Sequence, residues 1–191
     1  MNRHAGACLL YYSAVVHDAH GRVIRRYRRR ISQSFVANFL LKLYLRLGFT
    51  ANQSFTDTGG SSRSITTSNY WATSATVTTS TYGLVVGTGT NAVTINDTKL
   101  QTQVAHGVGA GQLQYGASVT NLPAADATGT SLILTRDFSN GSGGTITVKE
   151  IGIYVNDPTV SFKFCLARDL ATISITNGSQ LTLNYEMRTL I

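Results

Sequence analysis

The chain contains little charge, little proline and little cysteine. Of its 191 residues only 13% are charged, and there are 2 prolines and 2 cysteines. Disorder requires high net charge and few apolar side chains, so this low charge with 42% hydrophobic residues excludes a disordered chain. Cys8 and Cys165 are too few and too far apart for a disulfide framework, and their apolar neighbours predict two buried free thiols.

Several patterns that carry chemistry are also missing. No run of about eighteen apolar residues occurs, which excludes a membrane-spanning helix. The glycine clusters at 87–89 and 107–111 are not followed by a helix or by Gly-Lys-Ser/Thr, so they predict turns rather than phosphate loops. His17, His20 and His106 have no carboxylate partner in the pattern, and no catalytic triad or carboxylate pair stands out. The sequence therefore predicts a protein without catalytic residues, cofactor or metal.

The charge that is present is unevenly distributed. Residues 1–48 hold nine of the 16 Lys and Arg residues but only one of the 9 acids, whereas residues 49–191 are nearly neutral. Such an asymmetry predicts an acidic partner for the N-terminal quarter: nucleic acid, a membrane surface or an acidic protein face.

Within this quarter, residues 9–31 have the pattern of a β-hairpin. Leu9–Val16 is β-prone, Asp18–Gly21 suits a turn, and Arg22–Ile31 forms the second strand. Arginine occurs on both faces of that second strand. A strand of this kind cannot be central in a core, so we expect it at a sheet edge, at the surface or against a partner.

After residue 31 the spacing between successive apolar residues changes from two positions to about four. This spacing predicts one amphipathic helix over Gln33–Leu47, with Ser32 or Ser34 as N-cap and Gly48 just beyond its end. The apolar residues that define its face are Ile31, Phe35, Phe39, Leu43 and Leu47.

The rest of the chain predicts a mainly β protein. Residues 49–81 are rich in Thr and Ser and fit either a long loop or a set of short strands. From residue 82 onward, short β-prone runs alternate with turn residues, which predicts an antiparallel β-sandwich of jelly-roll or immunoglobulin-like type. Asn177-Gly178 predicts a hairpin turn between its flanking strands. The expected strands cover residues 82–87, 112–120, 130–139, 144–155, 160–168 and 180–190.

These patterns divide the chain into three parts. Residues 1–48 form a basic hairpin–helix segment for assembly, residues 49–81 form the polar stretch, and residues 82–191 form the sandwich body. The run of Arg and Tyr in the first part can bind phosphates or an acidic protein face. We favour protein docking, because an isolated strand lacks the geometry to recognise a groove of a nucleic acid. Tyr70 and Trp71 either insert into a neighbouring subunit or pack over the body's own core. The candidate docking residues are Arg25, Arg26, Tyr27, Arg28, Arg29, Arg30, Phe35, Phe39, Leu43, Tyr70 and Trp71.

The order of several short motifs resembles a known group of proteins. The segments 84–90 (LVVGTGT), 94–100 (TINDTKL) and 106–116 are followed by 138–154, by 165–170 (CLARDL) and by 181–185. This order resembles short bacteriophage virion proteins, and more loosely the virion-attachment modules of phage tail-collar fibre proteins. The resemblance covers residues 82–190 and, weakly, 18–47. It supplies no catalytic residues to carry over, and Arg168-Asp169 within it is expected to be an ordinary capping or surface pair.

The resemblance implies a non-enzymatic virion structural protein, made in the host cytoplasm and located in the phage particle. A tail, collar or neck component that docks on portal, tail or capsid subunits, and that forms a homo-oligomer, is the first expectation. A capsid decoration protein is the second. A third, from the aromatic residues alone, is a carbohydrate-binding module for host attachment that uses Tyr70, Trp71, Tyr115 and Tyr154. Nucleic-acid binding comes last, and no membrane contact is expected.

Overall fold

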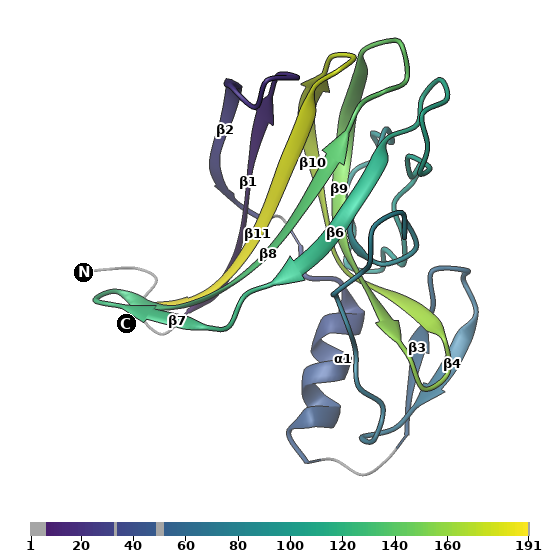
Figure 1. Cartoon of the computed structure of the whole chain (residues 1–191). Helices are drawn as coiled ribbons and strands as arrows, with labels where there is room; N and C mark the ends of the chain where they lie inside the picture. Colours follow the sequence, from purple (N-terminus) through teal and green to yellow (C-terminus); the bar gives the residue numbers. More distant parts are fainter. Residues whose placement is uncertain (1–6, 33, 49–51, 191) are drawn as a thin grey trace.

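The computed structural model describes residues 7–32, 34–48 and 52–190, and this part of the chain is mainly β with one helix (Figure 1). All paired strands are antiparallel. The predicted mainly β, antiparallel class with an N-terminal hairpin and one helix is therefore confirmed. The elements are β1 (Cys8–His17), β2 (Val23–Ile31), α1 (Ala37–Arg46), β3 (Gln53–Thr56), β4 (Ser62–Ile65), β5 (Gly83–Gly87), β6 (Gln114–Thr120), β7 (Ala124–Asp126), β8 (Gly129–Ser139), β9 (Ile146–Asp157), β10 (Phe162–Ile175) and β11 (Gln180–Leu190).

The strands form three sheets. The largest has the order β2-β1-β11-β8-β6, with β7 paired to β8 at one end. A second sheet has the order β10-β9-β5, and β3 pairs with β4 alone. In Figure 1 the ends of β1, β8 and β11 extend together with β7 as an arm beyond the body.

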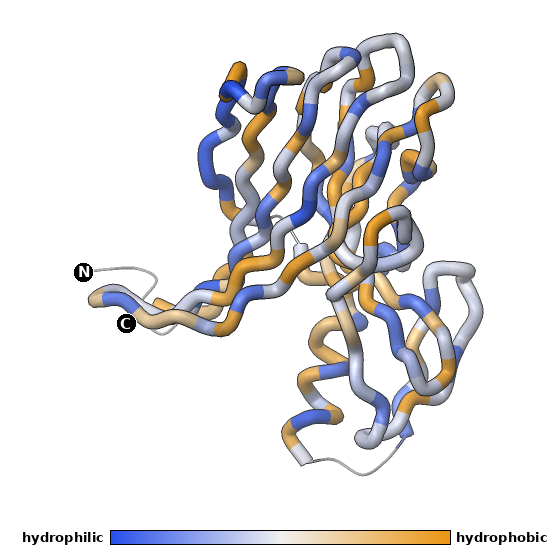
Figure 2. Tube along the Cα trace, viewed as in Figure 1, coloured by the Kyte–Doolittle hydropathy of each residue, from blue (hydrophilic) through white to orange (hydrophobic). Residues whose placement is uncertain are grey.

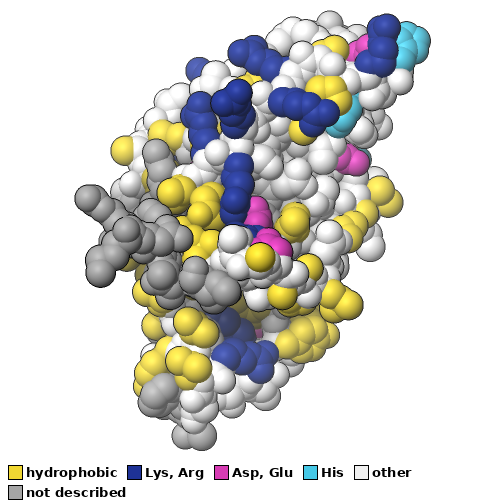
Figure 3. All heavy atoms as spheres, turned by 90° about the vertical axis from the view of Figure 1, so that its left-hand side faces the viewer, with side chains coloured by type: hydrophobic (Ala, Val, Ile, Leu, Met, Phe, Trp, Pro, Cys, Tyr) yellow, Lys and Arg dark blue, Asp and Glu magenta, His cyan; other side chains and the backbone are white. Residues whose placement is uncertain are grey.

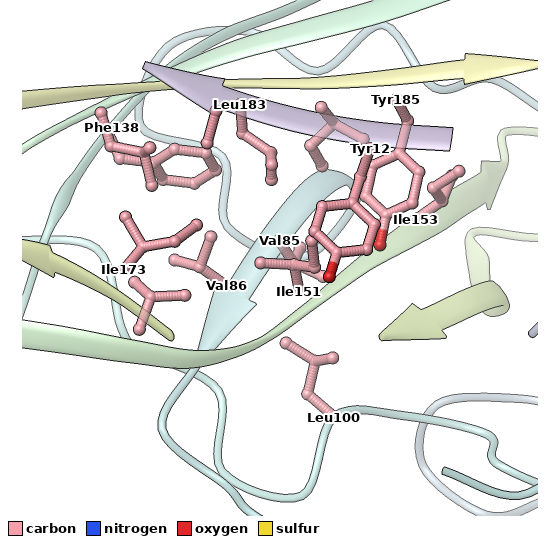
Figure 4. Packing of buried hydrophobic residues seen from close by; sticks show 14 of the residues in the cluster. Tyr12, Val85, Val86, Leu100, Phe138, Ile151, Ile153, Ile173, Leu183 and Tyr185 are labelled. Carbon is pink, nitrogen blue, oxygen red and sulfur yellow. The ribbon is translucent and has the colours of Figure 1, made fainter. Parts of the chain in front are cut away.

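The main core lies between the two larger sheets. Alternate residues of β11, such as Leu181, Leu183 and Tyr185, are fully buried, as expected for a strand with one face on a core. They meet apolar side chains of β5 and β9, including Val85 and Ile151, in one cluster (Figure 4). This alternation also appears as changing hydropathy along the strands in Figure 2. Burial of this surface is the main stabilising contribution to the fold.

A second, smaller cluster lies where α1 and the β3–β4 hairpin meet the ends of β9 and β10 (Figure 1). Leu45 of α1 packs there with Phe55, Ile65, Val155 and Phe164. The polar stretch 49–81 thus contains two short strands as well as loops, and its isolated apolar residues are anchors that attach it to the body.

The hairpin β1–β2 agrees with its prediction. The carboxylate of Asp18 accepts hydrogen bonds from the backbone N–H groups of His20 and Arg22 at 2.9 Å each. Gly21 has φ +77°, a conformation that glycine adopts without a steric cost. The arginine-rich strand β2 lies at the edge of its sheet, as its two-faced charge predicted.

The predicted start of the helix is wrong. Gln33 lies outside the described residues, and Phe35 forms a β-bridge with Ala167, so the chain is still extended there. Helix α1 begins only at Ala37, after Val36, which provides no side-chain cap. Neither predicted cap acts as one: the hydroxyl of Ser32 donates to the Asp169 carboxylate and that of Ser34 to the carbonyl of Arg168. The helix is shorter because its first predicted turn is anchored to β10.

The end of α1 agrees better with the sequence. The helix ends at Arg46, and Gly48 follows it with φ +100°. A glycine just beyond the last turn is the common way to end a helix.

Two further predictions are wrong. Asn177-Gly178 does form a turn, but β10 and β11 belong to different sheets, so the turn connects the two sheets instead of closing a hairpin. It is held there because the backbone N–H of Gly178 donates to the carbonyl of Asn140. Cys165 is buried as expected, whereas Cys8, at the start of β1, is exposed.

The close approach of the chain at Gly87 leads to a test. A Cβ at Gly87 would lie 2.5 Å from the carbonyl oxygen of Thr102 and 2.6 Å from a carboxylate oxygen of Glu150, whereas a Cβ at Gly144 meets nothing within 4 Å. We expect Gly87→Ala to lower the free energy of unfolding by about 1–3 kcal/mol, since added atoms in a packed site force displacements. Gly144→Ala should change it by less than about 0.5 kcal/mol, because the site is open. Urea denaturation of both variants checks this, and equal midpoints would contradict it.

Candidate functional site

The candidate docking residues fall on two separate surfaces. The arginines and Tyr27 lie on edge strand β2, and four apolar or aromatic candidates surround a pocket beside α1. Phe35 lines neither surface, because it faces a different hollow together with Ile95. Its ring stacks on that of Phe39 at a centroid distance of 3.9 Å. In Figure 3, Lys and Arg side chains gather over the upper part of the face that carries β1 and β2, and hydrophobic side chains are frequent lower down.

The arginines of β2 differ in how they are engaged. Arg29 forms an ion pair with Glu186 at 2.9 Å, and its guanidinium lies 3.6 Å from the centre of the Tyr11 ring. The guanidinium of Arg25 lies 5.2 Å from the Tyr27 ring centre. Among the described residues, no carboxylate forms an ion pair with the other three arginines of the run, which are Arg26, Arg28 and Arg30.

A groove of about 850 Å³ runs beside this strand, between β2 and β10. Cationic side chains and hydroxyl or apolar groups line it, and no Asp or Glu does. Its walls are the edge strands of the two larger sheets. The residues that line it are Tyr12, Arg25, Arg26, Tyr27, Arg28, Arg30, Thr90, Lys149, Leu170, Ala171, Thr172 and Ile173.

The second surface is an apolar pocket of about 370 Å³ between α1 and the loop at residues 70–73. Phe39 and Leu43 of α1 and Tyr70 and Trp71 of the loop all line it. These four candidates are distant in sequence, and the structure brings them together. Beyond the pocket, the helix continues the apolar surface with the exposed side chains Leu40 and Leu47.

Two cations stand at this pocket. The ammonium of Lys42 donates to the carbonyl of Asn69 at 2.6 Å and lies 4.6 Å from the centre of the Trp71 ring. The guanidinium of Arg46 donates to the same carbonyl at 2.7 Å. Burial, and secondly the charge of Arg46, lower the pKa of Lys42 to about 8, although Asp157 acts in the opposite direction. The pocket is therefore apolar with a positive rim.

The aromatic residues proposed for sugar binding do not share a surface. Tyr115 and Tyr154 are each only 2% exposed. Trp71 is half-buried and its ring stacks on Phe164 at 5.0 Å, so it packs over the chain's own smaller core. Tyr70 is 57% exposed, and the only other member of this set that lines its pocket in the described chain is the half-buried Trp71. The prediction that these four aromatic side chains together bind a sugar is therefore wrong. Side chains alternate between the two faces of a strand, and this alternation turns Tyr115 and Tyr154 toward the core.

The expectation of a surface pair at Arg168-Asp169 is also wrong. Arg168 is 2% exposed and its guanidinium binds the carboxylates of Glu150 at 2.9 Å and Asp97 at 2.8 Å. Glu150 is fully buried and also accepts the backbone N–H groups of Gly89, Gln101 and Thr102. Asp169 is buried on the opposite side of the strand, where it accepts hydrogen bonds from the hydroxyls of Ser32 and Tyr185.

Four of the six segments that carry the motif resemblance meet in this buried network. Gly87 and Gly89 come from the first segment, Asp97 and Leu100 from the second, Glu150 and Tyr154 from the later one, and Arg168 from CLARDL. The hydroxyl of Tyr154 accepts the backbone N–H of Leu100. The motifs therefore specify an internal network that ties two loops to β9 and β10, and not an exposed site.

Another buried arginine, Arg136, was not singled out from the sequence as important. Arg136 of β8 is 1% exposed and donates to backbone carbonyls instead of carboxylates. Its position on the same face as Leu132 and Leu134 was the available signal, because that face is turned to the core. Burial lowers the pKa of Arg136 to about 10, and it remains charged at neutral pH.

The chain matches no protein-family model, and neither a curated protein nor a solved structure matches it. No helix in the described ranges is long and apolar enough to cross a membrane. Within residues 7–32, 34–48 and 52–190, no three His, Cys, Asp or Glu side chains are grouped so that they could hold a metal ion.

Proposed function

We propose that the protein is a non-enzymatic structural component of a bacteriophage virion, placed in the tail, collar or neck. In this proposal the two larger sheets form a β-sandwich of jelly-roll or immunoglobulin-like type. The sandwich is the rigid body, copies of the chain form a homo-oligomer, and the docking surfaces attach it to portal, tail or capsid subunits.

The observation that carries this proposal is the pair of exposed surfaces, one basic and one apolar. One is the basic groove beside β2, and the other is the apolar pocket at α1 with the exposed leucines next to it. An unpaired sheet edge and a contiguous apolar patch are the features by which proteins add neighbours. Both occur on one small chain, as an assembly component requires.

The internal chemistry supports a structural role as well. The buried carboxylates Glu150 and Asp169 are used in hydrogen bonds and ion pairs that hold loops and strands together. Burial raises the pKa of the Cys165 thiol, which keeps it protonated and unreactive. These groups are arranged for stability, and this supports a protein that acts by binding.

Copy number in purified particles tests the proposal. We expect about three to a few dozen copies per particle, in keeping with the closed symmetries of tail and neck assemblies. Quantitative mass spectrometry against the major capsid protein measures this ratio. A ratio near one copy per capsid subunit would instead support a decoration protein, and absence from particles would overturn the virion role.

A matched pair of variants tests the apolar pocket as the attachment surface. Leu43 lines the pocket and is 46% exposed, and Val77 is 61% exposed and does not line the pocket. We expect Leu43→Asp to lower the copy number in particles about tenfold or more, because a charge at the centre of an apolar interface must be desolvated. Val77→Asp should leave it unchanged. Equal incorporation of the two variants would show that the pocket is not the attachment surface.

A further inference from the structure

The groove between β2 and β10 concentrates positive charge without any internal counterion. Arg25, Arg26, Arg28, Arg30 and Lys149 all line it. All five are exposed, and no ion pair joins them to a carboxylate of the described chain. Like charges held this close repel one another, so an anionic partner stabilises the arrangement.

The chain itself does not supply that partner. All 9 acidic residues lie in the described ranges, and every one of them already accepts a hydrogen bond or forms an ion pair within the chain. Among the described residues, a second copy of the same chain therefore offers no unengaged Asp or Glu side chain to the groove. The acids are Asp18, Asp57, Asp97, Asp126, Asp137, Glu150, Asp157, Asp169 and Glu186.

The backbone beside the groove is open for strand pairing. β2 pairs with β1 on one side only. β10 pairs with β9 on one side, and its other edge is bridged by Phe35 at Ala167, before the segment 170–173 that lines the groove. The ladder of β10 is interrupted by a register shift between Leu170 and Ile173, in the wall of the groove. An edge strand with free N–H and C=O groups is a template for an added extended segment.

The aromatic side chains of the groove are not available for stacking on bases. The hydroxyl of Tyr27 accepts the backbone N–H of Ser174, and Arg25 lies over its ring. Tyr12 is buried and its hydroxyl donates to the carbonyl of Leu170. Binding of single-stranded nucleic acid relies on exposed aromatic faces as well as positive charge. The groove therefore fits an acidic polypeptide better than a nucleic acid.

We propose that the groove binds an extended acidic segment of another protein, which adds to β2 as a further strand and places alternate carboxylates against the arginines. Its remaining side chains contact the hydroxyl and apolar groups of β10. That this segment belongs to another virion subunit rests on the proposed function, whereas its chemistry and its mode of binding do not.

The test uses defined peptides and the full chain. The probe is a nine-residue peptide of alternating Glu and Val, the length of β2, labelled for fluorescence anisotropy. Its control has the same side chains but is N-methylated at three consecutive central residues, which removes backbone donors on both edges. We expect the probe to bind and the methylated control to bind at least about tenfold more weakly, because strand addition depends on main-chain hydrogen bonds.

Two triple variants locate the site. Arg26→Gln, Arg28→Gln and Arg30→Gln together remove three charges from the groove, and Arg22→Gln, Lys99→Gln and Lys163→Gln remove three charges elsewhere. We expect the groove variant to weaken probe binding at least about tenfold and the control variant to have a much smaller effect. Bound probe should also slow amide hydrogen exchange within β2.

Several results would overturn the inference. These are no binding of the probe, equal binding of the methylated control, equal loss in both triple variants, or tighter binding of a nine-nucleotide oligothymidylate than of the peptide. Because the assay uses purified protein, its outcome is independent of the copy number in particles. The groove inference and the virion role can therefore fail separately.

Discussion

Replacement of Arg168 by methionine is expected to lower the free energy of unfolding by about 3–5 kcal/mol. Arg168 is buried between the carboxylates of Glu150 and Asp97, so its removal leaves two charges without their cation in a site with little water. Methionine fills most of the volume of the side chain, and the loss therefore reports on charge and hydrogen bonding more than on packing. Urea denaturation followed by circular dichroism measures it.

The control is an exposed ion pair of the same kind. Arg22 binds Asp18 at 2.7 Å at the tip of the β1–β2 hairpin, and its side chain is largely in solvent. Arg22→Met should leave the denaturation midpoint almost unchanged, because exposed pairs are screened and contribute little. Equal effects of the two substitutions would show that the buried network is not a major source of stability.

The acid sensitivity of the same variant gives an independent readout. Burial alone would raise the pKa of Asp97, but hydrogen bonds from Thr94 and Arg168 outweigh it and hold the pKa below the usual 3.8. A carboxyl whose pKa is lower in the folded than in the unfolded chain stabilises the fold fully above its unfolded pKa. This contribution is lost as the pH falls through the folded pKa. Arg168→Met should therefore make stability fall less steeply below about pH 4.

The local elements of the fold could be predicted because each depends on short-range patterns. The turn at Asp18–Gly21 and the strand expected over residues 180–190 follow from side-chain preferences and from burial of one face. Where a prediction was wrong, a contact with a distant segment prevailed. Phe35 is extended because it pairs with Ala167, and Asn177-Gly178 connects two sheets because β11 finds its partners in β1 and β8.

The two candidate surfaces could be predicted only in part, because each combines residues that are distant in the sequence. The charge pattern of β2 was sufficient to exclude a central position in a sheet, but the groove also needs Lys149 and residues 170–173, which are far away in the chain. The pocket at α1 likewise joins Leu43 to Trp71. Arg168 was expected at the surface because its adjacent acid, Asp169, suggested a local pair, whereas its partners lie 18 and 71 positions away.

Arg136 is the second residue whose loss should have a large effect, and it differs from Arg168 in having no carboxylate partner. Its guanidinium donates to the carbonyls of Gly116, Tyr82 and Leu84 at 2.9 Å each, and to those of Thr76 and Thr79. Charged donors are well suited to several carbonyls at once because their hydrogen bonds are stronger than those of neutral groups. One side chain of β8 thereby holds the loop before β5 in place.

We expect Arg136→Met to lower the free energy of unfolding by about 4 kcal/mol, because several carbonyls lose a buried charged donor. Arg136→Lys should have an intermediate effect of about 2 kcal/mol, since an ammonium keeps the charge but cannot span the five carbonyls. Arg26→Met, on an exposed face of β2, is the matched control and should be nearly neutral. Denaturation midpoints of the three variants measure these differences.

Hydrogen exchange separates a role in holding this loop from a general loss of stability. If Arg136 positions the loop, the amides at Thr78 and at Gly83–Gly87 should lose protection in Arg136→Lys by more than those of β1 and β11, which are distant from the guanidinium. Uniform loss across all strands would instead show that the residue contributes only to global stability. Unchanged exchange at β5 together with an unchanged midpoint would contradict the prediction, because the desolvation cost of a buried arginine without carboxylate partners must be offset largely by its hydrogen bonds to carbonyls.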